Sequence, residues 1–324
     1  MSDTMVPRIC ISVLNWNSHT HTIRCLKSLQ DLDYDNCHIV VVDNASSDGS
    51  VTMIRTTFPD VHIVCSETNL GYVGGHELAL QWALATQEFD LFLLLNNDVV
   101  VASDTLNHLV DAYRQHGDAL YGSVALNAES EHNDWVMAMA LWKFRADNRT
   151  LYFHTYHGLA YSVSFETTTP CLTPALHGSS LLIPLSVIRN YGFMDTDFFL
   201  YSEESDYCLR LRENGIHSFL VPASVIYHVG GGSGRGTARL KAIIRYYRIR
   251  NRLILLNRHS TYRSYLRQII YSLLFAAKNV AFGIVNRNKA LEGYYALVAV
   301  RDALLGRRGK TLAPEDGLLQ VGKG

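Results

Sequence analysis

Apolar runs alternate with helical patterns of apolar residues through the first third of the chain. The expected strands comprise residues 8–14, 38–42, 61–65 and 91–95, and the expected helices comprise residues 19–29, 50–57, 75–86 and 105–116. Strands that are apolar on both faces and alternate with helices are typical of a parallel sheet covered on both sides. The pattern therefore predicts an α/β fold with a Rossmann-like, mostly parallel central sheet and helices on both faces.

The rest of the chain follows different patterns. Residues 125–174 lack a regular period, which favours loops and antiparallel strands. Short strands are expected at 180–183, 218–221 and 224–228, and helices at 185–191 and 203–214, the second of which ends at Gly215. From Ala238 onward the pattern is helical, so we expect a C-terminal helical extension.

Charge divides the chain unevenly. Residues 1–234 carry 11 Lys/Arg and 26 Asp/Glu, whereas residues 235–324 carry 18 Lys/Arg and 4 Asp/Glu. Such a basic block favours a polyanionic partner, namely a phospholipid surface, a phosphate-bearing substrate or nucleic acid. The alternative is a solvated helix face, or a face docked on the acidic part of the same protein. The acidic first part argues against nucleic acid, because phosphate binding requires positive charge at the site.

One helical stretch of the basic block is mostly apolar. Residues 264–285 are interrupted only by Arg267 and Lys278, which makes them marginal as a membrane span. A helix lying on an anionic leaflet fits the pattern better, and an ordinary core helix is the alternative. Six scattered cysteines without a CxxC pair, and no signal-peptide pattern at the start, predict reduced thiols in a cytoplasmic setting.

Polar motifs follow the expected strands, where ligands of parallel sheets bind. Asp43 ends a strand in VVDNASSDGS, and its carboxylate can accept a hydrogen bond from a base or ribose, although Asp48 and Ser50 also suit a helix cap. NLGYVGG at 69–75 permits close backbone approach ahead of a helix, but it is not a dinucleotide fingerprint. Asn96-Asn97-Asp98 offers oxygen ligands for a hard divalent cation, or forms a polar turn.

Two later motifs offer acid–base chemistry. Glu203, Glu204 and Asp206 lie at the start of an expected helix, where acidic residues also suit the helix dipole. Mutual repulsion among three carboxylates raises at least one pKa, as a general base requires. His228 ends a strand before a glycine-rich loop and is a candidate ligand, although single histidines are more often structural.

The order of these motifs resembles family 2 glycosyltransferases, and most of all the bacterial rhamnosyltransferase-like branch that builds cell-surface polysaccharides. The ordered set covers residues 8–258 and consists of VLNWN, VVDNASSDGS, NLGYVGG, LLLNND, HGSSLLIP, FFLYSEESDYCLRL, HVGGGSG and YYRIRNRLIL. The resemblance implies a GT-A fold. It implies a catalytic domain at 1–235, with a nucleotide-sugar half at about 1–122 and an acceptor half at 123–235, followed by a basic helical region at 236–324.

The resemblance also implies roles for individual residues. Those expected to contact the donor are Asn15, Asp43, Asn69, Gly71, Asn96 and Gly178, of which Asn15 and Asp43 meet the nucleoside and Gly178 flanks the sugar. Asn96 and Asp98 match the ends of the metal-binding DxD, and His228 matches a histidine that completes the site. Glu204 matches the catalytic base, in a pair with Glu203, and Arg250-Asn251 matches a pair near the end of the catalytic region.

Three positions depart from the family pattern. Glu204 stands in place of an Asp, Asn96 in place of the first Asp of the metal motif, and Glu77 in place of an Asn. The first change lengthens the base by one methylene, and the second weakens the charge balance of the metal. The third leaves open which sugar is transferred.

The implied activity is inverting transfer of a sugar, with rhamnose as a candidate, from a dTDP- or UDP-linked donor. The implied acceptor is a hydroxyl of a glycan or a lipid-diphosphate-linked carrier, and the implied cofactor is Mg²⁺ or Mn²⁺. The expected location is the cytoplasm, peripheral at the inner face of the cytoplasmic membrane, with residues 236–290 as the contact.

Two other classes compete with this interpretation. A metal-dependent nucleotidyltransferase normally needs a basic, glycine-rich phosphate loop after the first strand, and VLNWNSHTH has no Lys or Arg. A non-catalytic carbohydrate-binding protein is the alternative outside enzymes. Release of nucleoside diphosphate separates an enzyme from a binder.

Overall fold

The computed structural model describes residues 6–127, 143–147, 150–154, 160–164, 168–228, 237–282 and 286–317. The chain forms two compact units. Of the described residues, unit 1 comprises 6–127, 143–147, 150–154, 160–164, 168–194 and 207–228, and unit 2 comprises 195–206, 237–282 and 286–317.

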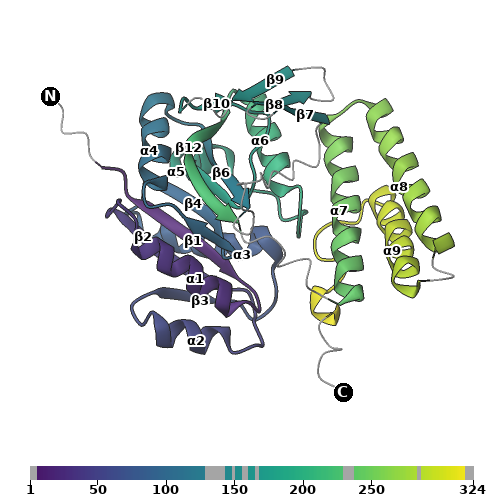
Figure 1. Cartoon of the computed structure of the whole chain (residues 1–324), viewed down its shortest axis with the longest axis horizontal. Helices are drawn as coiled ribbons and strands as arrows, with labels where there is room; N and C mark the ends of the chain where they lie inside the picture. Colours follow the sequence, from purple (N-terminus) through teal and green to yellow (C-terminus); the bar gives the residue numbers. More distant parts are fainter. Residues whose placement is uncertain are drawn as a thin grey trace. The chain divides into compact units, whose positions relative to one another are not determined.

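Unit 1 is built on a central sheet (Figure 1). Within the described residues nine strands form it: β1 (Ile9–Asn15), β2 (Cys37–Asp43), β3 (His62–Cys65), β4 (Leu91–Asn96), β5 (Val99–Val101), β6 (Leu120–Asn127), β10 (Cys171–Leu172), β11 (Ser180–Pro184) and β12 (Ser218–His228). The order is β10-β12-β6-β11-β4-β1-β2-β3, with β5 paired to β12.

The sheet is mostly parallel, which confirms the predicted fold class. β1 pairs in parallel with β2 and β4, β2 with β3, and β6 with β12. β11 runs antiparallel between β4 and β6. A separate antiparallel sheet contains β7 (Lys143–Asp147), β8 (Thr150–His154) and β9 (Ala160–Ser164), in the region for which antiparallel strands were expected.

Helices cover both faces of the sheet in unit 1. They are α1 (His19–Gln30), α2 (Ser50–Thr57), α3 (Gly71–Thr86), α4 (Thr105–His116) and α5 (Leu185–Tyr191). Ile9, Ile11 and Val13 of β1 share a core with apolar residues of α1 and α4. The alternate residues Ser12 and Leu14 meet α3, where His76 bonds Ser12 and Gly75 lies against Leu14. Because side chains alternate along a strand, α3 lies on the opposite face from α1 and α4.

Two of the predicted elements differ from the expected bounds by more than one residue. α3 begins at Gly71, four residues earlier than expected, and Gly71 enters it with φ +75°. The strands expected at 218–221 and 224–228 form the single strand β12, whose register shifts between Val221 and Val225. Pro222 lies in that irregularity and cannot donate a ladder hydrogen bond, which explains why two strands were expected.

Unit 2 is helical. It contains α7 (Ala238–His259), α8 (Tyr262–Phe282), α9 (Arg287–Leu304) and the short 3₁₀ helix Pro314–Gly317, together with residues 195–206, which include the first turn of α6 (Glu203–Glu213). A core joins Phe199 to Tyr246 and Tyr247 of α7 and to small residues of α8 and α9. No helix among the described residues has both the length and the apolar composition needed to cross a bilayer.

Candidate functional site

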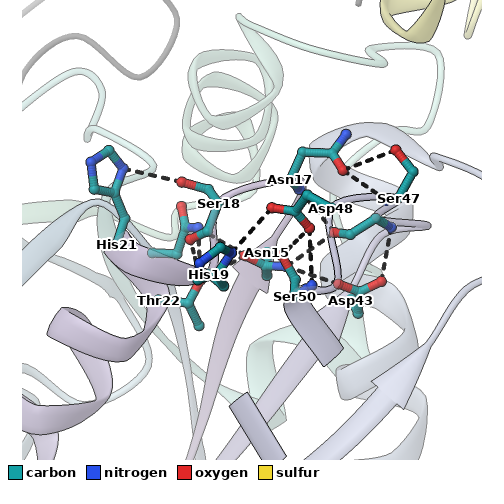
Figure 2. A network of polar contacts seen from close by, with 12 residues as sticks. Asn15, Asn17, Ser18, His19, His21, Thr22, Asp43, Ser47, Asp48 and Ser50 are labelled. Carbon is teal, nitrogen blue, oxygen red and sulfur yellow. Dashed lines mark hydrogen bonds and ion pairs between the residues drawn. The ribbon is translucent and has the colours of Figure 1, made fainter. Parts of the chain in front are cut away.

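The carboxyl ends of β1 and β2 hold Asn15 and Asp43 side by side. The parallel register pairs the two residues, and the Asn15 amide donates to Asp43 Oδ2 at 2.8 Å. The other carboxylate oxygen accepts from the backbone N–H of Ser46 at 2.9 Å, and Thr22 donates to Asn15 Oδ1 at 2.7 Å. Both side chains are buried. Their orientation is therefore fixed from several directions, as Figure 2 shows.

The loop that follows Asp43 is tied to the loop that follows Asn15 (Figure 2). Asn17 Oδ1 accepts from the backbone N–H of Ser47 at 2.7 Å, and His19 reaches Asp48 at 3.4 Å. Partial burial on its own raises the pKa of Asp48, but hydrogen bonds from Ser50 and His19 lower the pKa below its usual value overall. The Asp48 side chain is therefore an ionised carboxylate at neutral pH, within the loop that follows Asp43.

Asn44 joins the same strand end to the start of α3. Its amide donates to Asn69 Oδ1 at 3.1 Å and to the carbonyl of Gly71 at 2.9 Å, and its oxygen accepts from the N–H of Leu70 at 2.8 Å. Asn69 and Gly71, expected to lie against the donor, therefore also fix where the helix begins. Asn44 was not singled out from the sequence.

The Asn96-Asn97-Asp98 segment is the turn from β4 into β5. Asn96 ends β4, and the Asn97 amide donates to Thr22 at 2.9 Å and to Asn15 Oδ1 at 3.3 Å. Asn97 thereby connects this turn to the Asn15–Asp43 pair. It is a further residue of the site that its position beside Asn96 could have indicated.

Strand β5 brings Asp98 to His228. β5 pairs antiparallel with β12, with Val99 opposite His228, so the preceding residue Asp98 lies beside that histidine. Asp98 Oδ1 and His228 Nε2 are 3.4 Å apart, and both side chains are largely buried. His228 Nδ1 is buried with no hydrogen-bond partner among the described residues. Nowhere in the described residues is a group of three or more His, Cys, Asp or Glu side chains arranged to hold a metal ion.

His177 and Gly178 lie close to this pair. The rings of His177 and His228 meet edge to face with centroids 6.3 Å apart, and His177 Nδ1 accepts from the backbone N–H of Ser179 at 3.1 Å. Burial, and next the charge of His228, lower the pKa of His177 to about 4. Gly178 accepts from the Tyr72 hydroxyl, and a Cβ there would lie 2.8 Å from the same hydroxyl oxygen. His177 was not predicted from the sequence.

The acidic residues at the start of α6 divide into two kinds. Burial, and next the charge of Glu204, raise the pKa of Glu203 well above its usual value. Burial raises the pKa of Glu204 to about 7, and Glu204 is the more exposed of the two. The Oε2 atoms of both glutamates lack a hydrogen-bond partner among the described residues. With its pKa at about 7, Glu204 is able to exchange a proton near neutral pH.

Asp206 is different because it is ion-paired within unit 2. Arg258 and His259 of α7 reach its Oδ1 at 3.1 Å and 3.0 Å. Burial alone raises the pKa of Asp206, but the hydrogen bond from His259 and the charge of Arg258 lower the pKa overall. An ionised, doubly paired carboxylate anchors the helix rather than taking up protons near neutrality.

The turn that leads into the two glutamates is backbone-strained. Tyr201 and Ser202 have φ values of +70° and +75°, which non-glycine residues rarely adopt. The Asn251 amide donates to the carbonyls of Leu200 at 2.7 Å and Tyr201 at 3.0 Å, and the Arg248 guanidinium lies 4.5 Å from the centre of the Tyr201 ring. Contacts from α7 therefore hold the turn.

Arg250 is fully buried next to Asn251. It donates to Asn251 Oδ1 at 2.8 Å, to the carbonyl of Gly309 at 2.8 Å and to Thr311 at 2.7 Å. The Arg-Asn pair noted in the sequence thus connects the turn before Glu203 to the C-terminal segment of unit 2.

Solved structures place the fold in a known class. The chain is similar to the mannosyltransferase PcManGT from Pyrobaculum calidifontis, solved in complex with GDP-Man and Mn²⁺, with a TM-score of 0.57 and 15% identity. That similarity covers 94% of this chain and 89% of the mannosyltransferase. The fold is the GT-A fold of glycosyltransferases, as expected from the sequence.

The sequence model described as glycosyl transferase family 2 matches residues 10–173. The chain therefore belongs to family 2 of the glycosyltransferases, whose members transfer sugars, and the predicted family is confirmed.

Two characterised relatives are glycosyltransferases. The low-salt glycan biosynthesis hexosyltransferase Agl10 of Haloferax volcanii is 24% identical over 67% of this chain and 66% of its own length, so just under two thirds of that protein is matched. The dTDP-rhamnosyl transferase RfbF of Shigella flexneri is 20% identical over 92% of this chain and 95% of its own length.

Proposed function

We propose that this chain is an inverting hexosyltransferase that moves a sugar from a nucleoside-diphosphate donor to a hydroxyl of a glycan or lipid-linked acceptor in cell-surface polysaccharide synthesis. The observation that carries the proposal is the state of Glu204. Its pKa is raised to about 7 by burial, and its Oε2 atom has no hydrogen-bond partner among the described residues. A carboxylate in that state suits deprotonation of an alcohol near neutral pH.

Glu204 acts as the base in this proposal. The acceptor hydroxyl gives its proton to the Glu204 carboxylate, and its oxygen attacks the anomeric carbon of the donor. The bond between that carbon and the diphosphate breaks, the diphosphate leaves with the electron pair, and the configuration inverts. Glu203 is the more buried carboxyl, and burial together with the charge of Glu204 raises its pKa, which favours its neutral form.

The donor would bind at the carboxyl ends of β1, β2 and β4. The Asn15–Asp43 pair would meet the nucleoside, Asn69 and Gly71 the donor at the start of α3, and Gly178 the sugar. The many hydrogen bonds that fix Asp43 support this role, because a preoriented carboxylate loses little conformational entropy when it accepts a ligand hydroxyl.

The residues around β5 fit a divalent cation. Asp98 and His228 bring a carboxylate oxygen and an imidazole nitrogen within 3.4 Å, and Asn96 ends β4, the strand that precedes β5 in the chain. Carboxylate oxygen suits Mg²⁺ and Mn²⁺. We propose that Asp98, Asn96 and His228 hold such an ion. When bound, the ion would neutralise negative charge on the departing diphosphate.

Rhamnose carried on dTDP is the donor that we propose to test first. The similarity to the Shigella rhamnosyltransferase extends over nearly the whole of both chains, which supports that choice. UDP-linked hexoses form the comparison set. We further propose that the protein works in the cytoplasm at the inner face of the cytoplasmic membrane, where a lipid-diphosphate acceptor would be present.

Nucleoside-diphosphate release tests the proposal. Purified protein is incubated with dTDP-rhamnose or UDP-hexoses and a soluble acceptor glycan, with Mn²⁺, with Mg²⁺ or with chelator. We expect metal-dependent release of the diphosphate and a product of inverted anomeric configuration by NMR. Donor binding without release in any combination would favour a carbohydrate-binding protein, and release of pyrophosphate from a nucleoside triphosphate would favour a nucleotidyltransferase.

A further inference from the structure

Helix α8 presents a broad apolar face to solvent. Ile270 is 56% exposed, Leu274 is 61% exposed and Phe282 is 59% exposed. Other large exposed side chains of the same helix are Tyr262, Leu266, Tyr271, Leu273 and Val280. Isolated exposed apolar residues are ordinary on protein surfaces, but a gathering of them along one helix indicates a binding surface.

The exposed residues form a stripe along α8. Tyr262, Leu266, Ile270, Leu273 and Val280 recur at intervals of three, four and seven residues, which places them on one face of an α-helix. A neighbouring face of the helix is already used within unit 2. Ser272, Ala276 and Asn279 are buried, and a Cβ on Gly293 of α9 would lie 2.8 Å from the carbonyl of Ala276. α8 therefore packs on α9 through small residues and leaves its large ones outside.

Cations border the apolar stripe. Arg263, Arg267 and Lys278 are exposed on α8, and none of the three forms an ion pair with a described residue. Because no acidic residue occurs between Arg235 and Leu291, α8 carries no carboxylate that could neutralise them. Apolar side chains bordered by uncompensated cations are the composition of helices that lie in the interface of anionic membranes.

The same charges argue against a second copy of the chain as the partner. In a two-fold contact, α8 would face α8 and bring Arg263, Arg267 and Lys278 near their own copies. A contact of that kind needs carboxylates to offset the repulsion, and α8 has none. Anionic lipid headgroups supply the complementary charge directly.

We propose that α8 lies on the surface of an anionic bilayer, with its apolar stripe among the upper acyl chains and Arg263, Arg267 and Lys278 at the lipid phosphates. The inference deepens the proposed function, on which it rests for the lipid-linked acceptor, by naming the surface that would hold the enzyme beside it. Each basic residue near such a surface increases binding by roughly fivefold.

Vesicle flotation of the full chain tests the proposal. The protein is mixed with vesicles of phosphatidylcholine alone or with about 30% phosphatidylglycerol, a level at which the surface potential attracts basic residues. We expect binding to the anionic vesicles and at least about tenfold weaker binding for the double variant Ile270→Glu/Leu274→Glu. Arg263→Glu/Arg267→Glu should lose binding similarly. Met53→Glu is the control, because Met53 is 46% exposed on α2 of unit 1, and it should bind as the unmodified chain does.

Three results would overturn the proposal. They are no binding to anionic vesicles, equal binding by the α8 variants and the Met53 control, and a concentration-dependent dimer in sedimentation that Ile270→Glu/Leu274→Glu dissociates. Circular dichroism of each variant checks that it is folded. Release of nucleoside diphosphate to a soluble acceptor is measured in parallel without vesicles. Failed flotation with normal release of the diphosphate would reject only the proposal that α8 binds a membrane. Normal flotation without release would reject only the proposed function.

Discussion

The side-chain amide of Asn251 donates a 3.0 Å hydrogen bond to the carbonyl oxygen of Tyr201, whose φ is +70°. A second bond from the same amide reaches Leu200 at 2.7 Å. Left-handed backbone at a non-glycine residue costs on the order of 1–3 kcal/mol, so the turn persists only while its surroundings hold it. The turn immediately precedes Glu203 and Glu204, and its geometry therefore sets where the two carboxyl groups point.

Replacing Asn251 should impair turnover more than it impairs donor binding. Asn251→Ala leaves two carbonyls without their donor, and we expect a loss of stability of about 1–3 kcal/mol and a kcat lower by at least about tenfold with little change in the donor KM. Asn279→Ala is the matched control, because Asn279 is also buried and its amide donates to the carbonyl of Phe275 at 2.8 Å.

The control should lose stability without the fall in kcat. Ser202→Gly added to Asn251→Ala should restore part of kcat, because glycine adopts positive φ without strain. Equal kcat in Asn251→Ala and Asn279→Ala would contradict a positioning role for Asn251.

Glu204→Gln should abolish most turnover but leave donor binding intact. The amide cannot accept the acceptor proton, and general-base catalysis contributes ~10²–10⁴-fold. Binding of dTDP or UDP, measured by calorimetry, should change little. Because the pKa of Glu204 is about 7, kcat of the unmodified enzyme should rise as the pH increases through 7. A normal rate in Glu204→Gln would show that another group is the base.

The Glu203–Glu204 pair should make the protein less stable at alkaline pH. Burial raises the pKa of both groups in the folded state, so between the unfolded pKa and the folded pKa the folded chain binds more protons than the unfolded chain. The free energy of unfolding then falls as the pH rises from about 4.5 through 7.

Glu203→Gln should flatten that slope and raise stability at pH 8, as read by urea denaturation across the pH range. Asp206→Asn should change the pH dependence of stability in the opposite direction. Its pKa is lowered in the folded state, so its contribution is present at neutral pH and lost as pH falls through the folded pKa. A steeper fall in stability with rising pH in Glu203→Gln would contradict the assignment.

Asp98→Ala should lose the metal-dependent part of donor binding. The carboxylate is the single charged oxygen ligand that we assign to the proposed ion, and His228→Ala should show a smaller loss in the same direction. Titration of dTDP or UDP with and without Mn²⁺ measures both. Asp111→Ala serves as control, because Asp111 is exposed on α4. If Asp98→Ala bound the donor as tightly as the unmodified chain does with Mn²⁺, this metal site would be excluded.

The alternation of strands and helices could be predicted because it depends on local patterns. The helices Ser50–Thr57, Thr105–His116 and Leu185–Tyr191 begin and end where the apolar period does. Strand β6 could not be predicted in the same way, because residues 120–127 mix apolar and polar residues without a regular period. Gly122 lies in this strand where a Cβ would be only 2.6 Å from the Leu176 side chain, a contact that no local pattern records.

The candidate site was predictable in its residue types and not in its contacts. Asp98 meets His228 only because β5 pairs antiparallel with β12, an interaction between segments 130 residues apart that no local pattern records. Ion pairing with distant residues also distinguishes acidic groups that look equal in sequence. Asp206 differs from Glu203 because Arg258 and His259, on a helix that follows much later, reach one carboxylate and not the other.

The central claim is that Asp98 and Glu204 act on one donor molecule. A crystal structure of the protein with Mn²⁺ and an unreactive nucleoside-diphosphate sugar tests it most directly. We predict the metal on Asp98, the diphosphate on the metal, and the Glu204 carboxylate facing the anomeric carbon on the side opposite the leaving group. A bound donor whose anomeric carbon faces away from Glu204, or a Glu204 that opens onto a separate cavity, would contradict the account.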